Sequence, residues 1–432
     1  MYDSPIMSNR SKAILLILID LVILCLSLTV VVGLRLGPSA LPKHYDLFSY
    51  LFPLWILLYF IEGMYTLKTF NPEGTAVSLL RGTFLAVIVA MLGTYVAPDR
   101  LTVLTPKTNL VLTAVVALPF LYFWRRFFFR FFSREKRLVS TVLIGNQQTV
   151  DLIKHEIQRR PHLGFKIDEH ISGDTQLIAI ERNLKDNANL YQDVFAKLEA
   201  GVEVMDLARF AENVSGKIPL AAIDESWFIE HCGHQESRSF DLIKTALDKT
   251  VAITLFTMLL PVTAVLLPFL LIVHGRPIFF KQIRTGRHNK PFKLYKLRSM
   301  VVDAEKDGAQ WAKPKDARVT TVGKFLRKSR LDELPQLLNI VRGEMSLVGP
   351  RPERPEIIEK TLAREIPYYN LRHLVKPGVT GWAQVTFRYG FSTQDSLEKL
   401  QYDLYYVKNR NLWLDILIVL KTVKTVLTGA GQ

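Results

Sequence analysis

Two adjacent carboxylates, Asp332 and Glu333, stand in the stretch SRLDELPQLLNIVRGEMSLVGPRPERPE, which covers residues 329–356. Arginines precede and follow the pair, Arg330 and Arg351 among them. One ionised carboxylate can hold a divalent cation against a phosphate, while the other attacks phosphorus as in aspartyl-phosphate enzymes. Arginines can neutralise the remaining phosphate oxygens through charge-assisted hydrogen bonds. The stretch is therefore suited to chemistry on a phosphate, although a solvated acidic helix cap explains the two acids equally well.

A short helix is predicted to position these acids. Pro335 suits the first turn of a helix, and Gly343 suits its end. Between them, apolar residues recur at helical spacing, at Leu337, Leu338 and Val341. The acids then lie at the amino end of the helix, where the helix dipole and free N–H groups stabilise carboxylates and attract phosphate.

The composition indicates a membrane protein with anionic partners. The 432 residues are 49% hydrophobic, and the formal net charge is +15. That apolar share is high for a soluble enzyme, and the charge favours lipid headgroups or phosphorylated substrates. Nucleic acid is not an expected partner, because the basic residues cluster beside apolar segments. With two cysteines, Cys25 and Cys232, neither a disulfide framework nor a cysteine-based zinc site is expected.

Four apolar runs in the first third of the chain are each about long enough to cross a bilayer. Basic residues precede the first run and follow the last one, from Arg125 onward, so both flanks are predicted to lie in the cytoplasm. Asp20 and Glu62 lie in or near these runs, and either a helix-helix contact or a functional site would explain them. The runs are residues 13–34, 47–65, 80–97 and 108–124.

A soluble α/β module is expected after the fourth run. Residues 138–145 (LVSTVLIG) are typical of a buried strand, and the segment after them has helical spacing. The loop Gly145-Asn146-Gln147-Gln148 has one glycine, whereas a dinucleotide-binding turn needs several. We therefore interpret residues 138–235 as a Rossmann-like module without dinucleotide binding, with a role in assembly or regulation.

A second apolar stretch begins at about Lys249 and contains Pro261 and Pro268. Proline removes a helical hydrogen bond and kinks the helix. The residues that follow are rich in lysine and arginine, which opposes their translocation across a membrane. A kinked helix that enters the membrane and returns to the cytoplasmic face is the preferred interpretation, and an ordinary fifth span is the alternative.

From about residue 240 to its end, the chain resembles the bacterial sugar transferase family, the monotopic polyprenol-phosphate phosphoglycosyl transferases. The amino-terminal spans and the degenerate Rossmann-like module resemble the large-form members. The family's re-entrant helix falls on residues 249–273, with Pro261 at its break. The resemblance rests on five blocks in order: RPIFFKQIRTG (276–286), FKLYKLRSM (292–300), RLDELPQLLNIVRGEMSLVGPRPERPE, KPGVTGWAQV (376–385) and YDLYYVKN (402–409).

The expected fold is membrane α plus α/β, in three parts. Residues 1–132 form four transmembrane helices, residues 133–240 form the Rossmann-like module, and residues 241–432 form an α/β catalytic domain with the re-entrant helix. The extra amino-terminal parts are compatible with a homodimer.

The resemblance also implies a reaction. Asp332 would attack the β-phosphate of a UDP-sugar and release UMP, while Glu333 would help to hold Mg²⁺. Undecaprenyl phosphate would then accept the hexose-1-phosphate from the covalent aspartyl intermediate, giving undecaprenyl-diphospho-hexose. This would be the first membrane step of exopolysaccharide, capsule or O-antigen synthesis, on the cytoplasmic face of the bacterial inner membrane.

Further site residues are implied by their positions in or near the matched blocks. Arg388 stands where many members have an Asn-Gly-Arg-Asn run, but its neighbours differ, so the sugar is not identified: glucose or galactose is the default, and an N-acetylated sugar stays open. The expected phosphate ligands are Lys296, Arg298, Arg330, Arg351 and Arg388, supported by Pro352, Glu353 and Asp403.

Two other functions stay open at this point. A glycosyltransferase would move the sugar without its phosphate and release UDP instead of UMP. An inactive membrane scaffold would release neither nucleotide, although the intact Asp332 and Glu333 argue against it.

Overall fold

The computed structural model of the chain divides into two compact units, residues 1–140 with 157–166 and residues 141–156 with 167–432. The residues that the structure describes are 9–65, 72–96, 106–132, 138–182, 188–232, 238–304, 316–387 and 392–428.

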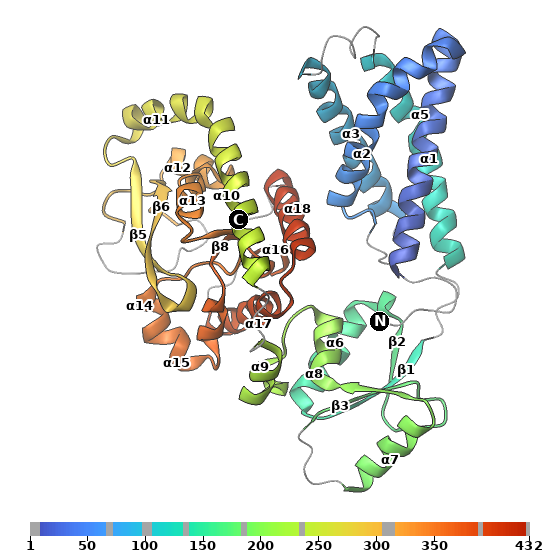
Figure 1. The fold of residues 1–432 in the computed structure, drawn as a ribbon, viewed down its shortest axis with the longest axis vertical. Helices are drawn as coiled ribbons and strands as arrows, with labels where there is room; N and C mark the ends of the chain where they lie inside the picture. Colours follow the sequence, from blue (N-terminus) through green and yellow to red (C-terminus); the bar gives the residue numbers. More distant parts are fainter. Residues whose placement is uncertain are drawn as a thin grey trace. The chain divides into compact units, whose positions relative to one another are not determined.

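The first unit contains a bundle of four long helices (Figure 1). Helix α1 packs against α2 and α5, and α3 packs against the same two helices. Each helix has a stretch long and apolar enough to cross a membrane, which confirms the four predicted apolar helices. The helices are α1 (Asn9–Leu36), α2 (Leu41–Ile61), α3 (Pro72–Val96) and α5 (Pro106–Phe132), with a 3-10 turn, η1 (Pro38–Ala40), between the first two.

A buried ion pair joins the first and fourth helices of this bundle. Arg125 Nη2 lies 2.6 Å from Asp20 Oδ2, and both side chains are fully buried. The Tyr65 hydroxyl donates to the same oxygen at 2.9 Å. Asp20 therefore makes a helix-helix contact, as a buried carboxylate requires. Arg125 was predicted to belong to the basic flank beyond the fourth span. It lies inside the bundle instead, because α5 continues to Phe132.

A four-stranded sheet follows in the chain, with strand order β2-β1-β3-β4. Strand β3 pairs in parallel with both β1 and β4. Strand β1 leads through a short loop into α6, which confirms the strand-loop-helix start predicted at residues 138–145. The strands are β1 (Val139–Ile144), β2 (Phe165–Asp168), β3 (Leu177–Ile180) and β4 (Glu203–Asp206), and the helical segments are α6 (Gln147–Arg159), η2 (Pro161–Leu163), α7 (Ala188–Glu199), α8 (Leu207–Ser215), η3 (Leu220–Ala222) and α9 (Glu225–Cys232).

The segment from α8 to α9 packs on the carboxyl-terminal part of the chain. Ile218 and Trp227 belong to one buried apolar cluster with Leu362 and Leu404. The indole Nε1 of Trp382 also donates to the Gly216 carbonyl at 2.9 Å.

Helices α10 (Arg238–Met258) and α11 (Leu260–His274) form a bent pair. Their axes meet at 62° across Leu259, and Pro261 lies in the first turn of α11 (Figure 1). A proline is tolerated there because the first N–H groups of a helix have no partner within it. Large apolar side chains are exposed along both helices, including Ile253, Phe256, Met258, Val265, Phe269 and Ile272.

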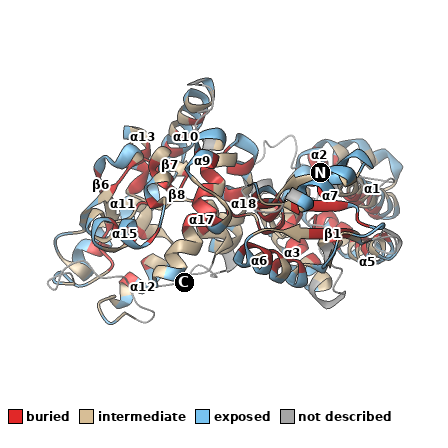
Figure 2. Cartoon of the chain, turned by 90° about the horizontal axis from the view of Figure 1, so that it is seen from below, coloured by how far each residue is buried: buried red, intermediate tan, exposed pale blue. Residues whose placement is uncertain are grey.

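The rest of the chain is built around two small sheets. Strands β5 (Phe279–Thr285) and β6 (Pro291–Leu297) form an antiparallel hairpin, and β7 (Ser346–Val348) pairs in parallel with β8 (Gly378–Thr380). Helix α17 carries a continuous buried stretch, seen in red in Figure 2. The helical segments are η4 (Arg287–Asn289), α12 (Thr321–Lys328), η5 (Leu331–Glu333), α13 (Gln336–Arg342), α14 (Pro355–Ile357), the π-helical η6 (Ile358–Leu362), α15 (Ala363–Glu365), η7 (Tyr369–Leu374), α16 (Trp382–Thr386), α17 (Thr393–Asn409) and α18 (Leu412–Thr428).

Candidate active site

The two acids lie in a 3-10 turn of their own, η5, just before α13. Pro335 and Gly343 bound α13 as predicted, and Gly343 takes a left-handed φ of 83° there. The acids were expected at the amino end of that helix, and they lie there in a short turn of their own. Arg330 begins the turn with a left-handed φ of 59°, which is uncommon for a residue with a side chain and is often found at functional sites.

Asp332 is buried and incompletely hydrogen bonded. Its side chain is 7% exposed, and none of the described residues donates a hydrogen bond to its Oδ1 atom. Burial raises the pKa of Asp332, and the neighbouring charge of Glu333 raises it further. A buried carboxylate oxygen without a donor keeps its lone pairs available to a substrate atom.

Three cations from different segments surround Glu333. Lys296 Nζ on β6 lies 3.7 Å from Glu333 Oε1, and the nearest guanidinium nitrogens of Arg330 and Arg351 each lie 3.5 Å from it. Burial alone would raise the pKa of Glu333, but these three positive charges together hold it below its ordinary value. Glu333 is therefore ionised within a cationic cluster. We call Asp332, Glu333, Lys296, Arg330 and Arg351 the acid-pair cluster.

The pKa of the lysine in this cluster is also shifted. Burial lowers the pKa of Lys296 to about 8, against the opposing charge of Glu333. Lys296 thus remains mostly protonated near neutral pH and can contribute its charge to the site.

A tight backbone crossing places Arg351. The loop after β7 passes so close to β8 that a Cβ atom on Gly349 would fall 2.3 Å from the Lys376 carbonyl oxygen. The Gly349 N–H donates to Thr380 O at 2.9 Å. At the end of this loop, Arg351 Nη1 donates to Gln384 Oε1 at 3.2 Å. Gln384 lies in the matched block 376–385, but sequence reasoning did not single it out.

Arg298, in contrast, is not brought to the acid pair. Its guanidinium donates to the carbonyls of His274, Gly275 and Arg276 at the end of α11, and the side chain is 8% exposed. The family resemblance placed it with Lys296 on one basic strand, where residues two apart would share a face. β6 ends at Leu297, so the alternation does not extend to Arg298.

The supporting residues of the sequence analysis lie around the loop that carries Arg351. The Pro352 carbonyl accepts from Arg284 Nη1 at 3.0 Å, and the same nitrogen lies 3.7 Å from Glu353 Oε2. Asp403 Oδ2 lies 2.7 Å from Arg372 Nη2. Arg284 lies in a matched block and Arg372 does not, and neither was predicted. Arg388 lies outside the residues that the structure describes.

A groove of about 180 Å³ lies beside Glu333. Its lining includes the basic residues Arg327, Lys328 and Arg330. It also includes apolar residues, among them Leu337, Val379 and Val385. The groove can therefore receive an anionic group together with an uncharged one.

The carboxylates of the site decide whether a magnesium ion would fit there. Within the described ranges, no three His, Cys, Asp or Glu side chains form a metal-binding group. Mg²⁺, however, is commonly held by one or two carboxylates with phosphate and water completing its shell. Lys296, Arg330 and Arg351 all make their closest approach to Oε1 of Glu333, so Oε2 is the better placed oxygen for a metal ion. The acid pair fits a magnesium ion that arrives with a phosphate.

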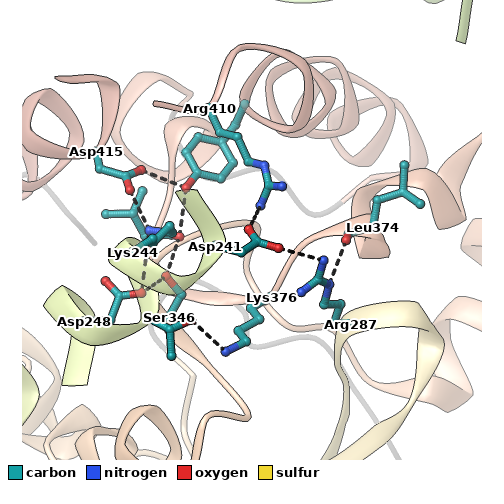
Figure 3. Close-up of polar contacts among 12 residues, drawn as sticks. Asp241, Lys244, Asp248, Arg287, Ser346, Leu374, Lys376, Arg410 and Asp415 are labelled. Carbon is teal, nitrogen blue, oxygen red and sulfur yellow. Dashed lines mark hydrogen bonds and ion pairs between the residues drawn. The ribbon is translucent and has the colours of Figure 1, made fainter. Parts of the chain in front are cut away.

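A second charged cluster connects α10 to β7, α17 and α18 (Figure 3). Lys244 Nζ lies 2.6 Å from Asp415 Oδ2 and 3.6 Å from Asp248 Oδ2, and Ser346 Oγ donates to Asp248 at 2.5 Å. Asp241 lies 2.9 Å from Arg410 and 3.1 Å from Arg287. We call this set, which also includes Tyr406, the α10 network.

The chain is similar to known sugar transferases. The family model described as "Bacterial sugar transferase" matches residues 239–429. The "UDP-N-acetylgalactosamine-undecaprenyl-phosphate N-acetylgalactosaminephosphotransferase" of Aeromonas hydrophila is 38% identical over 271 residues, which are 61% of this chain and 62% of that protein. The "Uncharacterized sugar transferase EpsL" of Bacillus subtilis (strain 168) is 41% identical over 198 residues, 44% of this chain and 90% of that protein.

A further relative is the "UDP-glucose:undecaprenyl-phosphate glucose-1-phosphate transferase" of Escherichia coli (strain K12). It is 40% identical over 184 residues, which cover 42% of this chain and 39% of that protein. The chain thus spans less than two thirds of the Aeromonas and Escherichia relatives, and most of the Bacillus protein.

Proposed function

This chain belongs to the bacterial sugar transferase family, and on that premise we propose that it transfers a sugar-1-phosphate from a UDP-sugar to undecaprenyl phosphate. The products are UMP and undecaprenyl-diphospho-sugar. The observation that carries the proposal is the buried Asp332, whose Oδ1 has no donor among the described residues, beside an acid held by three cations. The names of the Aeromonas and Escherichia relatives support the same reaction class.

In the first half-reaction, the Asp332 carboxylate attacks the phosphorus that bears the sugar. The bond from this phosphorus to the bridging oxygen breaks, and UMP leaves with that oxygen. In the second half-reaction, a phosphate oxygen of undecaprenyl phosphate attacks the phosphorus of the aspartyl-phosphosugar. The acyl phosphate bond breaks, and the free Asp332 carboxylate is restored.

The cations of the acid-pair cluster neutralise the phosphate charge in both halves. Lys296, Arg330 and Arg351 lie 3.5 to 3.7 Å from Glu333, which is longer than a charge-assisted hydrogen bond. A phosphate oxygen can therefore replace the carboxylate as their partner without a large movement. Glu333 Oε2 would hold Mg²⁺, which supplies further charge neutralisation when it is bound.

The donor sugar is not assigned by the site. The name of the Aeromonas relative specifies N-acetylgalactosamine, and that of the Escherichia relative specifies glucose, so both UDP-sugars belong in the first test. We propose that the reaction is the first membrane step of exopolysaccharide, capsule or O-antigen synthesis.

The membrane topology is also a proposal. The 62° bend and the apolar side chains exposed along α10 and α11 support a re-entrant helix that returns to the face it entered. The catalytic part then lies on the cytoplasmic face of the inner membrane, as the basic residues after α11 favour. Labelling of single cysteines in spheroplasts with a membrane-impermeant maleimide tests this: residues 280–300 should stay unlabelled until the membrane is opened.

We propose further that the sheet from β1 to β4 belongs to a Rossmann-like module without a dinucleotide. The Asn146 N–H, which would face a phosphate in a binding loop, donates to Glu181 Oε2 at 2.6 Å. A carboxylate of the chain thus takes the place of a phosphate.

Two further predictions concern the organisation of the chain. Limited proteolysis can test the division into residues 1–132, 133–240 and 241–432. Mass photometry can test the homodimer.

Nucleotide release tests the main proposal. Purified, detergent-solubilised chain receives Mg²⁺, undecaprenyl phosphate and, in turn, UDP-N-acetylgalactosamine, UDP-glucose and UDP-galactose. Release of UMP with one donor, abolished in Asp332→Asn, is the expected result. Release of UDP would identify a glycosyltransferase instead, and release of neither nucleotide would favour the scaffold.

A further inference from the structure

The main chain that carries Arg351 is held by two arginines from distant parts of the sequence. Arg372 Nη2 donates to the Arg351 carbonyl at 2.9 Å, and Arg284 Nη1 donates to the Pro352 carbonyl at 3.0 Å. The next carbonyl, that of Glu353, accepts from the Thr285 N–H at 2.9 Å. Three consecutive carbonyls are therefore held, each by a different donor group.

Arg372 is buried with its own counter-charge. Its side chain is 5% exposed, and Asp403, which is 3% exposed, lies 2.7 Å from it. The Tyr369 hydroxyl accepts from its other terminal nitrogen. Removing such a pair from water is costly, and apolar side chains of the same volume often stabilise a fold equally well. The geometry gives the pair a task that apolar residues cannot perform, because only a donor can hold the Arg351 carbonyl.

The side chain of Arg351 reaches the acid pair from this anchored main chain. Its guanidinium lies 3.5 Å from Glu333 Oε1 and donates to Gln384 at 3.2 Å. Both contacts are at the long end of the hydrogen-bond range. The anchored main chain determines where the Arg351 side chain starts, and a shift of about 1 Å at a reacting centre can cost about 100-fold in rate.

We propose that Arg372, held by Asp403, is a positioning residue: through the Arg351 carbonyl it fixes the Arg351 guanidinium beside Glu333 and the phosphates of the substrate. The inference rests on the proposed function. It adds a residue outside the five matched blocks to the machinery of the site, and it gives Asp403 a defined role.

A double-mutant cycle on UMP release tests this role in the full-length, detergent-solubilised protein. Arg351→Met is expected to lower kcat/KM about 100-fold. Arg372→Lys keeps the charge beside Asp403 but loses the planar fork that reaches two acceptors, and we expect a loss of about 10-fold to 100-fold. If Arg372 acts through Arg351, the double variant is no slower than Arg351→Met alone. A double variant whose loss in kcat/KM equals the product of the two single losses would overturn the proposal.

Arg410→Lys is the matched control. Arg410 is also a buried arginine, 9% exposed, and its guanidinium pairs with Asp241 in the α10 network. In the double variant, the fold-loss in kcat/KM from Arg410→Lys should multiply with that from Arg351→Met, whatever the size of the Arg410→Lys loss. A non-additive control would mean that the cycle reports general loosening of the fold, and the proposal would then fail.

Hydrogen-deuterium exchange gives a readout that needs no turnover. In Arg372→Lys, exchange should increase in peptides covering residues 345–358, and it should stay unchanged there in Arg410→Lys. Unchanged exchange in Arg372→Lys would overturn the positioning role even if activity fell.

If Arg372→Lys does not fold, the joint variant Arg372→Met with Asp403→Leu removes both charges together, and the same cycle and exchange measurements apply. Failure of the proposed function is recognised separately, because the unmodified protein would then release no UMP.

Discussion

The acid-pair cluster and the α10 network contain the same kinds of side chain and use them differently. In the α10 network the closest ion pairs measure 2.6 to 3.1 Å, and each of Asp241, Asp248 and Asp415 is contacted by at least one cation. In the acid-pair cluster three cations stand 3.5 to 3.7 Å from one carboxylate oxygen, while the described residues give Asp332 Oδ1 no donor.

The difference separates structural charges from reactive ones. Short ion pairs join α10 to Asp415 on α18, to Arg410 and to Arg287, and they leave little charge for a ligand. Loose contacts and an unpartnered oxygen cost stability, so their presence indicates a site that a substrate completes. Changes to the two regions should therefore affect different measurements.

The largest effect is expected for Asp332→Asn. The variant lacks the nucleophile, so UMP release should fall at least about 1,000-fold. Its melting temperature should stay the same or rise, because an amide avoids the burial of a charge. Donor turnover and thermal unfolding in the same detergent check both parts. Retained turnover would remove Asp332 from the proposed mechanism.

Chelation is expected to have the next largest effect. Excess EDTA should lower UMP release at least about 100-fold, and added Mg²⁺ should restore it, if Glu333 holds the metal with the phosphates. The α10 network needs no metal, so the melting temperature should not respond to EDTA. Turnover that persists after exhaustive chelation would contradict the magnesium assignment.

Lys244→Met should show the opposite pattern. It leaves Asp415 and Asp248 without their shared cation in a buried site, which typically costs about 3–5 kcal/mol. The melting temperature should therefore fall by several degrees, while the folded protein at low temperature keeps turnover within a few-fold of normal. Lys244→Met paired with Asp415→Leu should recover part of the stability. An inactive but fully stable Lys244→Met would place the network in the chemistry instead.

The smallest effect concerns a buried ring that belongs to neither cluster. Burial, together with the charge of the neighbouring Arg372, lowers the pKa of His373 to about 3. Its Nδ1 is hydrogen bonded to Asn289, and the described residues offer Nε2 no partner. The folded protein thus binds fewer protons than the unfolded chain below pH 6.5, so the stability from this group is complete above pH 6.5 and falls as the pH decreases.

By this linkage, acidification from pH 7.5 to 5 should cost about 2 kcal/mol through His373. His373→Gln should lose less stability over the same range, although it is less stable at pH 7.5. Thermal unfolding of both proteins at the two pH values checks this. Equal pH sensitivity would show that the ring can take up a proton in the folded state.

Local patterns accounted for the elements and for the reacting acids. The four apolar helices follow from runs of about 20 apolar residues, and the bent pair follows from prolines within an apolar stretch. The bounds of α13 follow from Pro335 and Gly343, and the adjacent acids are visible in the sequence itself. Each of these signals lies within one turn or one segment, so the sequence by itself determined them.

The partners of each charge were decided only by the tertiary structure. Lys296 and Arg298 are two residues apart, yet one faces Glu333 and the other donates to the end of α11. Asp20 meets Arg125 across 105 positions of the chain, and Arg372 holds the carbonyl of Arg351. A charged side chain has no preferred partner along the sequence, because its interaction energy depends on distance and burial in space. Only the packing of the helices and strands sets those two quantities.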